Sequence, residues 1–332
     1  MNGATAWTLA AWAAAGGCAV LMGFAIQRGA TCVVAAVDEW STQRRTTRLR
    51  ALVEAALWVG GGLIAARALG ALPHAPGGHA LGAWTVAGAA LLGAGAWINR
   101  ACVFGAIARL GTGEWAYLAT PFGFYAGCLG LPRMLAAPLP AEASPVWRAP
   151  AAPLLAAFAL FAAWRLFSGL RAWRRRAMLW TPHAATTAIG LAFLAMLLLV
   201  GAWAYTDALA ELAQGMSMGL AARLGLFACL LAGALLGGWH AGRWSRTLPP
   251  AGAWVRCFAG GLLMGWGSGL IPGGNDGLIL VGLPLGWPYA WVAFAVMVAT
   301  VALAIRLSAV RRCPVPAASA ETASPAAPPA AG

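Results

Sequence analysis

The sequence predicts an all-α polytopic membrane protein of about nine transmembrane helices, with two inverted repeats and short re-entrant or broken helices. Composition is the first supporting observation: 61% of the 332 residues are hydrophobic and 9% are charged, against roughly 45–50% and ~25% in soluble domains. The 43 Gly and 18 Trp residues are the second, because small residues let membrane helices approach and Trp favours the membrane interface. These observations exclude an ordinary soluble domain.

Nine apolar segments are long enough to cross the membrane, since a helix rises about 1.5 Å per residue and the hydrocarbon core is about 30 Å thick. They lie near residues 7–27, 51–70, 81–97, 115–135, 151–167, 184–204, 218–242, 254–271 and 287–307.

Arginine sets the expected orientation. All 22 basic residues are Arg, and most of them cluster after the first, fifth, seventh and ninth segments. Nine crossings place these loops on one side, which the positive-inside rule assigns to the cytoplasm. We therefore expect the N-terminus outside and the C-terminus in the cytoplasm. Because the arginines lie between apolar runs and not on one face, no nucleic-acid partner is expected.

An internal repeat appears when the chain is shifted by 172 residues along itself. The shift carries the third segment onto the eighth, five crossings later, and an odd number of crossings reverses direction. The two copies are therefore expected to be inverted. The matched residues include Gly88, Gly93, Gly95, Gly105, Trp115 and Tyr117, which pair with Gly260, Gly265, Gly267, Gly277, Trp287 and Tyr289.

Four regions follow from this repeat. Residues 1–137 form the first membrane repeat, and residues 184–312 form the second, inverted one. Residues 138–183 are expected to hold an external linker, a connecting span and a basic cytoplasmic loop. Residues 313–332, rich in Ala and Pro, are expected to be a disordered cytoplasmic tail.

Each repeat contains a break in its apolar pattern, at 97–105 and at 270–277, followed by a piece too short to span, 104–110 and 278–283. Non-helical backbone at membrane depth is tolerated only inside protein or beside a water-filled cavity. Paired breaks are typical of a central transport site. The alternative is that each break is only the loop at the end of a span.

The segment 23–32 places Gln27, Arg28 and Gly29 inside an apolar stretch. A charge within a span costs at least ~2.5–3.5 kcal/mol, which indicates a functional role. Arg28 could hold an oxyanion, helped by the N–H groups of a short helix expected to start at Ala30. Alternatively, Arg28 reaches the interface from the inner end of the first span.

Three motifs together resemble the YeeE/YedE family of sulfur-compound transporters. They are Gly-x-x-x-Gln-Arg-Gly-x-x-Cys at 23–32, a Leu-x-Gly-x-Gly run leading to Cys102-x-x-Gly105, and the glycine-rich second copy at 260–277. The resemblance covers most of residues 10–307.

The resemblance implies uptake of thiosulfate along a narrow, cysteine-lined path between two inverted halves. Its motifs carry over Arg28, Cys32 and Cys102 as path residues. By the same analogy it implies a cytoplasmic sulfurtransferase as a possible partner.

The sequence departs from the family where the third path cysteine is expected. Gly273, Gly274, Asn275 and Asp276 stand there, and the shift aligns Cys102 with Gly274. Asp276 would repel a dianion unless it is protonated or lies off the path, so a less charged sulfur species competes with thiosulfate.

Thiol chemistry favours a sulfur-containing solute, since a thiol is a weak donor and a polarizable acceptor, and a nearby Arg or helix N-terminus favours its anionic form. By sequence, Cys32 and Cys102 meet this condition, although Cys is also commonly a small buried hydrophobe. The latter interpretation applies to Cys18, Cys128, Cys229 and Cys257.

Other chemistry has little support in the sequence. The seven cysteines include no CxxC pair, so neither a metal site nor a cofactor is expected. Glu54 and Glu114 lie near span ends, where solvated interfacial positions are expected and pairing with Arg is the alternative.

Two functions remain open, and a purely structural assembly factor is a third possibility. The first is a bacterial inner-membrane transporter, not an enzyme, that takes up a small sulfur-containing anion or related solute. Its path residues are Gln27, Arg28, Gly29, Cys32, Cys102, Gly273, Gly274 and Asn275. The alternative is a membrane-embedded thiol or persulfide relay, in which Cys32 and Cys102 exchange sulfur with a partner and nothing crosses.

Overall fold

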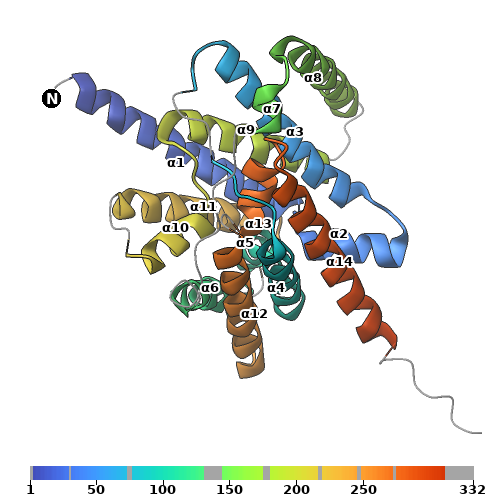
Figure 1. The fold of residues 1–332 in the computed structure, drawn as a ribbon. Helices are drawn as coiled ribbons and strands as arrows, with labels where there is room; N and C mark the ends of the chain where they lie inside the picture. Colours follow the sequence, from blue (N-terminus) through green and yellow to red (C-terminus); the bar gives the residue numbers. More distant parts are fainter. Residues whose placement is uncertain are drawn as a thin grey trace, which may run out of the picture.

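A computed structural model describes residues 3–29, 31–72, 77–130, 144–174, 180–215, 219–244, 248–271 and 274–310. The regular structure within these ranges is helical (Figure 1). Seven of the helical segments are long and apolar enough to cross a membrane. The prediction of an all-α polytopic membrane protein is therefore confirmed.

The first half contains four longer helices interrupted by shorter ones. In chain order they are α1 (Gly3–Gly29), α2 (Val33–Gln43), α3 (Thr47–Ala68), α4 (Ala83–Asn99), α5 (Val103–Gly111), the 3₁₀ turn η1 (Trp115–Leu118) and α6 (Ala119–Gly130).

The second half repeats this alternation after two connecting helices, α7 (Pro145–Arg148) and α8 (Ala151–Arg174). It consists of α9 (Pro182–Val200), α10 (Tyr205–Ala213), α11 (Leu220–His240), α12 (Ala251–Leu270), α13 (Gly274–Gly277), the π-helical turn η2 (Leu278–Gly282) and α14 (Pro288–Val310).

The seven candidate spans correspond to seven of the nine predicted segments, with α2 continuing the first and α5 the third. The predicted segments 115–135 and 254–271 are not among them. Within the described residues the former contains only η1 and the 12-residue α6, while the latter is α12, rich in glycine and carrying Arg256. These two helices pack on each other, so their surfaces need less apolar character than helices that face lipid.

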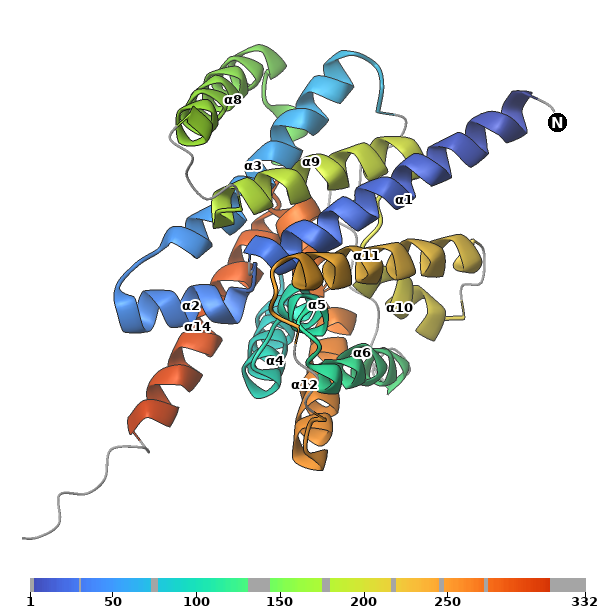
Figure 2. The same ribbon diagram turned by 180° about the vertical axis from the view of Figure 1, so that it is seen from behind.

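Helix packing follows an exchange of the two halves. Helix α1 packs on α11 as α9 packs on α3, and α6 packs on α12 as α14 packs on α4. The short helices obey the same rule, because α2 packs on α14 and α10 packs on α6. Both views show α1, α9 and α11 side by side (Figures 1 and 2). This pattern is expected of two related halves in which the helices of one half pack on those of the other.

The central contact joins α4 to α12 through glycines. A methyl group on Gly88 would lie 2.9 Å from the carbonyl oxygen of Gly267, and one on Gly95 would lie 2.7 Å from that of Gly260. Residue numbers rise along α4 as they fall along α12, so the two helices run antiparallel. The shift of 172 pairs Gly88 with Gly260 and Gly95 with Gly267. A helix and its repeat partner thus cross about a local two-fold axis, as inverted halves require.

The limits of the four predicted regions stay predictions, since the linker residues 138–143 and the tail 313–332 lie outside the described residues. The orientation of the termini also stays a prediction.

Helix α8 lies at the edge of the molecule in both views (Figures 1 and 2), and none of its described side chains is buried. Its polar attachment is Glu54 of α3, which forms an ion pair with Arg165 at 2.5 Å and contacts His183 of α9 at 2.6 Å. The expectation of a solvated Glu54 is wrong, because this side chain is buried between two basic groups. Glu114 does pair with Arg, at 3.0 Å from Arg109.

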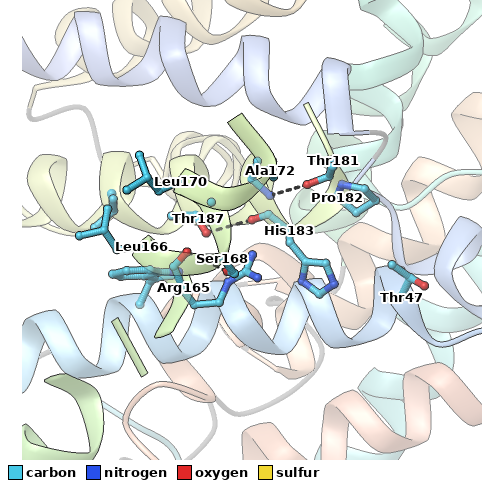
Figure 3. Close-up of a pocket in the computed structure, with 14 residues that line it drawn as sticks. Thr47, Arg165, Leu166, Ser168, Leu170, Ala172, Thr181, Pro182, His183 and Thr187 are labelled. Carbon is cyan, nitrogen blue, oxygen red and sulfur yellow. Dashed lines mark hydrogen bonds between the residues drawn. The ribbon is translucent and has the colours of Figure 1, made fainter. Parts of the chain in front are cut away.

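A cavity of about 830 Å³ lies between α8 and the start of α9. Arg165 and His183 border it beside apolar side chains such as Leu166 and Leu170 (Figure 3). The cavity lies beside the second half of α8, whereas the first half packs on α3 through Phe158 and Phe161 against Trp58. None of its lining residues belongs to the two helix breaks.

Replacing Gly95 by alanine is expected to destabilise the fold, since the added methyl group meets backbone atoms that cannot rotate away. We expect a loss of roughly 1–3 kcal/mol, seen as a lower midpoint of thermal unfolding in detergent followed by tryptophan fluorescence. Gly225→Ala in α11 is the matched control, because nothing lies within 4 Å of its methyl group. Equal midpoints for the two variants would contradict the proposed role of the glycine crossing.

Candidate functional site

Two cysteines from separate helix starts meet inside the bundle. Cys32 precedes the first residue of α2, and Cys102 precedes that of α5. The backbone N–H of Cys102 donates to the sulfur of Cys32 at 3.4 Å, and that of Val33 donates to the sulfur of Cys102 at 3.3 Å. Both residues are buried, both are free thiols, and the thiols are within hydrogen-bonding contact.

This arrangement concentrates positive potential at two sulfur atoms. The first N–H groups of a helix have no partner inside it, and the helix dipole makes that end partly positive. Two such ends point at one place here, with thiols where Ser or Asp usually accepts the N–H groups. The site therefore suits a negatively charged, polarizable atom such as a terminal sulfur.

Gly105 provides the space for this contact. A methyl group at this position would lie 2.5 Å from the sulfur and 3.0 Å from the Cβ of Cys32. The spacing Cys102-x-x-Gly105 thus has a packing reason: the first turn of α5 presents a bare backbone to the opposing thiol.

Gln27 and Gly29 have packing contacts at the end of α1. Gln27 is buried between α5 and α11, where methyl groups on Gly111 and Gly237 would meet its side chain at 2.6 and 3.0 Å. Gly29 lies against Ala185 of α9. Together they anchor the chain just before it turns to Cys32.

Arg28 is partly exposed, and its Nε is buried without a hydrogen-bond partner. The expected helix start at Ala30 is wrong, because α2 begins at Val33 with Cys32 as its N-cap. Ala30 itself lies outside the described residues. The thiol, and not the backbone of residue 30, therefore stands at the helix end.

The second break gathers oxygen atoms around Gly274, whose φ of 55° is left-handed. A methyl group there would lie 3.1 Å from Asp276 Oδ1, 3.2 Å from Thr206 Oγ1 and 3.5 Å from Ser268 Oγ. Thr206 also donates to Asp276 Oδ1 at 2.5 Å. Three elements, α10, α12 and α13, thus bring polar groups to one buried point.

Asn275 lies in the same turn and is buried, with neither side-chain oxygen nor nitrogen hydrogen-bonded. An unsatisfied buried amide costs about 1–3 kcal/mol, so its retention indicates a use. Gly273, predicted beside it as a path residue, lies outside the described residues, as does Pro272.

Tyr205 connects the two breaks. Its hydroxyl donates to the carbonyl of Val103 at 2.9 Å, one residue after Cys102, while the next residue, Thr206, binds Asp276. Sequence reasoning missed this link because α10 reads as an external loop. The signal that could have revealed the link is the position of α10 in the second repeat, which matches the position of α2 in the first.

Asp207 lies one residue further along α10, outside the candidate spans. Burial raises the pKa of Asp207 to about 7, the charge of Asp276 adds to the rise, and Arg223 opposes it. Arg223 of α11 is itself paired with Glu211 of α10. The side of the cysteine pair that faces α10 therefore carries carboxyl groups whose negative charge Arg223 neutralises only in part.

The breaks are also in contact through α5 and α13, which pack on each other.

A family model for sulphur transport matches residues 28–303, more than four fifths of the chain. The chain belongs to the YeeE/YedE family. No curated protein matches it. The family predicted from the motifs is thus confirmed, and the matched range contains both breaks.

The two breaks of this YeeE/YedE protein differ at positions that the repeat aligns. Cys102 caps α5 with a thiol, whereas the position aligned with it, Gly274, offers only backbone and leaves its surroundings to Asp276 and Thr206. The first break therefore presents polarizable sulfur atoms at partly positive helix ends, whereas the second presents oxygen atoms that include a carboxyl group.

Gly105→Ala is expected to separate the two thiols, because its methyl group would overlap the sulfur of Cys32. Mild oxidation should convert Cys32 and Cys102 to a disulfide in the wild type, and we expect the variant to give at least about fivefold less, read by peptide mass spectrometry. Gly17→Ala in α1, with open space around the added methyl group, is the control. Undiminished cross-linking in Gly105→Ala would contradict this packing.

Proposed function

We propose that this protein carries a small sulfur-containing solute, such as thiosulfate, into the cell along a path that passes between Cys32 and Cys102. The observation that carries the proposal is the reciprocal contact of the two thiols at opposed helix N-termini. Membership of a sulphur-transport family supports a sulfur-containing solute in general.

The pair suits a solute with one soft sulfur and a negative charge. Each thiol can donate weakly to that sulfur, while the N–H groups of α2 and α5 stabilise the charge. Donation can shift from Cys32 to Cys102 without a change of oxidation state, because only hydrogen bonds are exchanged. Water is excluded from these buried positions, so the contacts act in a low dielectric.

The remaining path residues have supporting roles in this proposal. Gln27 and Gly29 hold the end of α1 against its neighbours and so position Cys32. Arg28 attracts or orients the anion. Gly273, Gly274 and Asn275 form the opposite wall, where the free amide of Asn275 can hydrogen-bond to the passing solute.

The arginine clusters support an orientation with the N-terminus outside and the C-terminus in the cytoplasm of a bacterial inner membrane. In this orientation α10, with its carboxyl groups, lies toward the outside. The start of α3 lies toward the cytoplasm.

Cys32→Ser and Cys102→Ser are each expected to lower uptake of ³⁵S-labelled thiosulfate at least about tenfold, because a hydroxyl is a poor partner for soft sulfur. Cells lacking other sulfur uptake systems provide the assay, with membrane levels of each variant measured alongside. Cys229→Ser is the matched control, since this cysteine lies in α11 away from both breaks. Normal uptake by both path variants would refute the thiol path.

A thiol or persulfide relay uses the same contact differently. It would hand sulfur to a cytoplasmic sulfurtransferase without moving a solute. Mixed disulfides trapped between Cys32 or Cys102 and a partner, with no accumulation of label by the wild type, would favour this alternative. Accumulation of intact labelled thiosulfate in liposomes containing the purified protein alone would exclude it.

Uptake of thiosulfate should rise severalfold as the outside pH falls from about 8 to about 6. The pKa of Asp207 is raised to about 7, so its carboxylate is mostly charged at the higher pH and mostly neutral at the lower one. Thiosulfate keeps both charges over this range and is repelled less by the neutral form. Asp276 and Arg223 are the charged groups that act on this carboxyl, the first raising its pKa and the second lowering it.

Asp207→Asn is expected to remove most of this pH dependence and to keep uptake near its low-pH value. Glu39→Gln, which changes a carboxylate on α2, is the control and should retain the wild-type profile. A variant Asp207→Asn with an unchanged profile would show that another group sets the dependence.

A further inference from the structure

A second cavity, of about 630 Å³, opens beside the cysteine pair on the side of α2. Its notable feature is that arginines from four separate segments line it: Arg48 of α3, Arg100 after α4, Arg109 of α5 and Arg256 of α12. Arg48 belongs to the arginine cluster that predicts the membrane orientation, and Arg100 lies two residues before Cys102 in the sequence. The structure brings all four to one concave surface.

The cavity carries an excess of positive charge. The four arginines face a single acidic lining residue, Asp38. Two of them also have a carboxylate partner outside the lining, since Arg109 pairs with Glu114 and Arg48 lies 3.9 Å from Glu39. Within the described ranges Arg100 and Arg256 form no ion pair.

Arg256 has unused hydrogen-bonding capacity at this surface. Its guanidinium lies over the ring of Tyr117, 5.9 Å from the centroid, and its Nη2 donates weakly to Cys257. Its Nη1 is buried and has no hydrogen-bond partner. A buried cationic donor without an acceptor is costly, and an anion in the cavity would supply the missing acceptor.

Arg100 reaches the cavity from a strained backbone. Its φ of 60° is left-handed, a conformation that costs a non-glycine residue roughly 1–2 kcal/mol. The same turn ends α4 and sends the chain directly to Cys102. One backbone feature thus places a guanidinium in the cavity and a thiol in the pair.

The cavity borders the thiols closely. Val34 and Ala35 line it, and they are the second and third residues of α2, directly after its N-cap Cys32. From the other helix, Arg109 also lines the cavity. Helix α5 therefore carries a path thiol at its start and a cavity arginine in its last turn.

We infer that this cavity is a vestibule that binds a doubly charged sulfur oxyanion beside the cysteine pair. Guanidinium groups match the oxygens of such an anion through paired N–H donors, whereas the thiols next to them match its soft sulfur. The vestibule prefers dianions to neutral solutes, because a dianion can neutralise the positive charges of Arg100 and Arg256, which form no ion pair within the described ranges. The inference rests on the proposed transport function but concerns a separate binding site.

A reporter cysteine tests the vestibule without transport. Ser308 lines the cavity, is uncharged and is partly buried, so Ser308→Cys adds a thiol with little change in shape. Purified protein in detergent is treated with an anionic or a cationic methanethiosulfonate, and modification of residue 308 is followed by peptide mass spectrometry. We expect the anionic reagent to react faster, and sulfate to slow it more than chloride at equal ionic strength. Sulfate is the probe because it does not react with the reagents.

Arg100→Gln and Arg256→Gln, each added to the reporter, should lower the ratio of anionic to cationic rates on the order of fivefold and abolish protection by sulfate. Arg243→Gln is the matched control, since this exposed arginine lies outside the cavity lining. An equal ratio in Arg256→Gln and Arg243→Gln, or protection by sulfate no stronger than by chloride, would overturn the inference. Because no uptake is measured, this result is independent of whether Cys32 and Cys102 form the path.

Discussion

The close antiparallel crossing of α4 and α12 is the contact on which the site depends. Each helix ends in one of the two breaks, so their relative position determines where Cys102 and Gly274 lie. Because Gly95 and Gly260 let backbone meet backbone, the crossing has little freedom to slide.

The breaks solve one problem, unpaired backbone inside a membrane protein, in two ways. At α2 and α5 the free N–H groups bond to the sulfur atoms of Cys32 and Cys102, which are weak acceptors that can release them to a ligand. At the second break Asp276 takes the N–H of Gly277 with a strong oxygen acceptor. The first solution leaves the backbone available to a passing anion, whereas the second keeps it occupied.

The sequence was sufficient for the fold class, the family and the antiparallel halves, because composition, motif spacing and the repeat act over short stretches or whole spans. It could not place Tyr205 or the vestibule arginines, which come from distant segments and meet only after the halves pack. Glu54 was misjudged for a related reason: the two basic partners that allow its burial lie more than 100 residues away. The start of α2 was missed because a cysteine cap has no signature in helix propensity.

Helix α8 contributes almost nothing to the core, yet the architecture requires it. Two halves of four crossings each, joined by a loop, would insert in the same direction, because an even number of crossings returns the chain to the side where it started. One additional crossing turns the second half over, and that task needs only length and apolar surface. Its exposed side chains and, among the described residues, its ion pair with the buried Glu54 agree with such a minimal requirement. Helix α8 thus supplies the one additional crossing that lets two copies of a unit form a single, internally antiparallel protein.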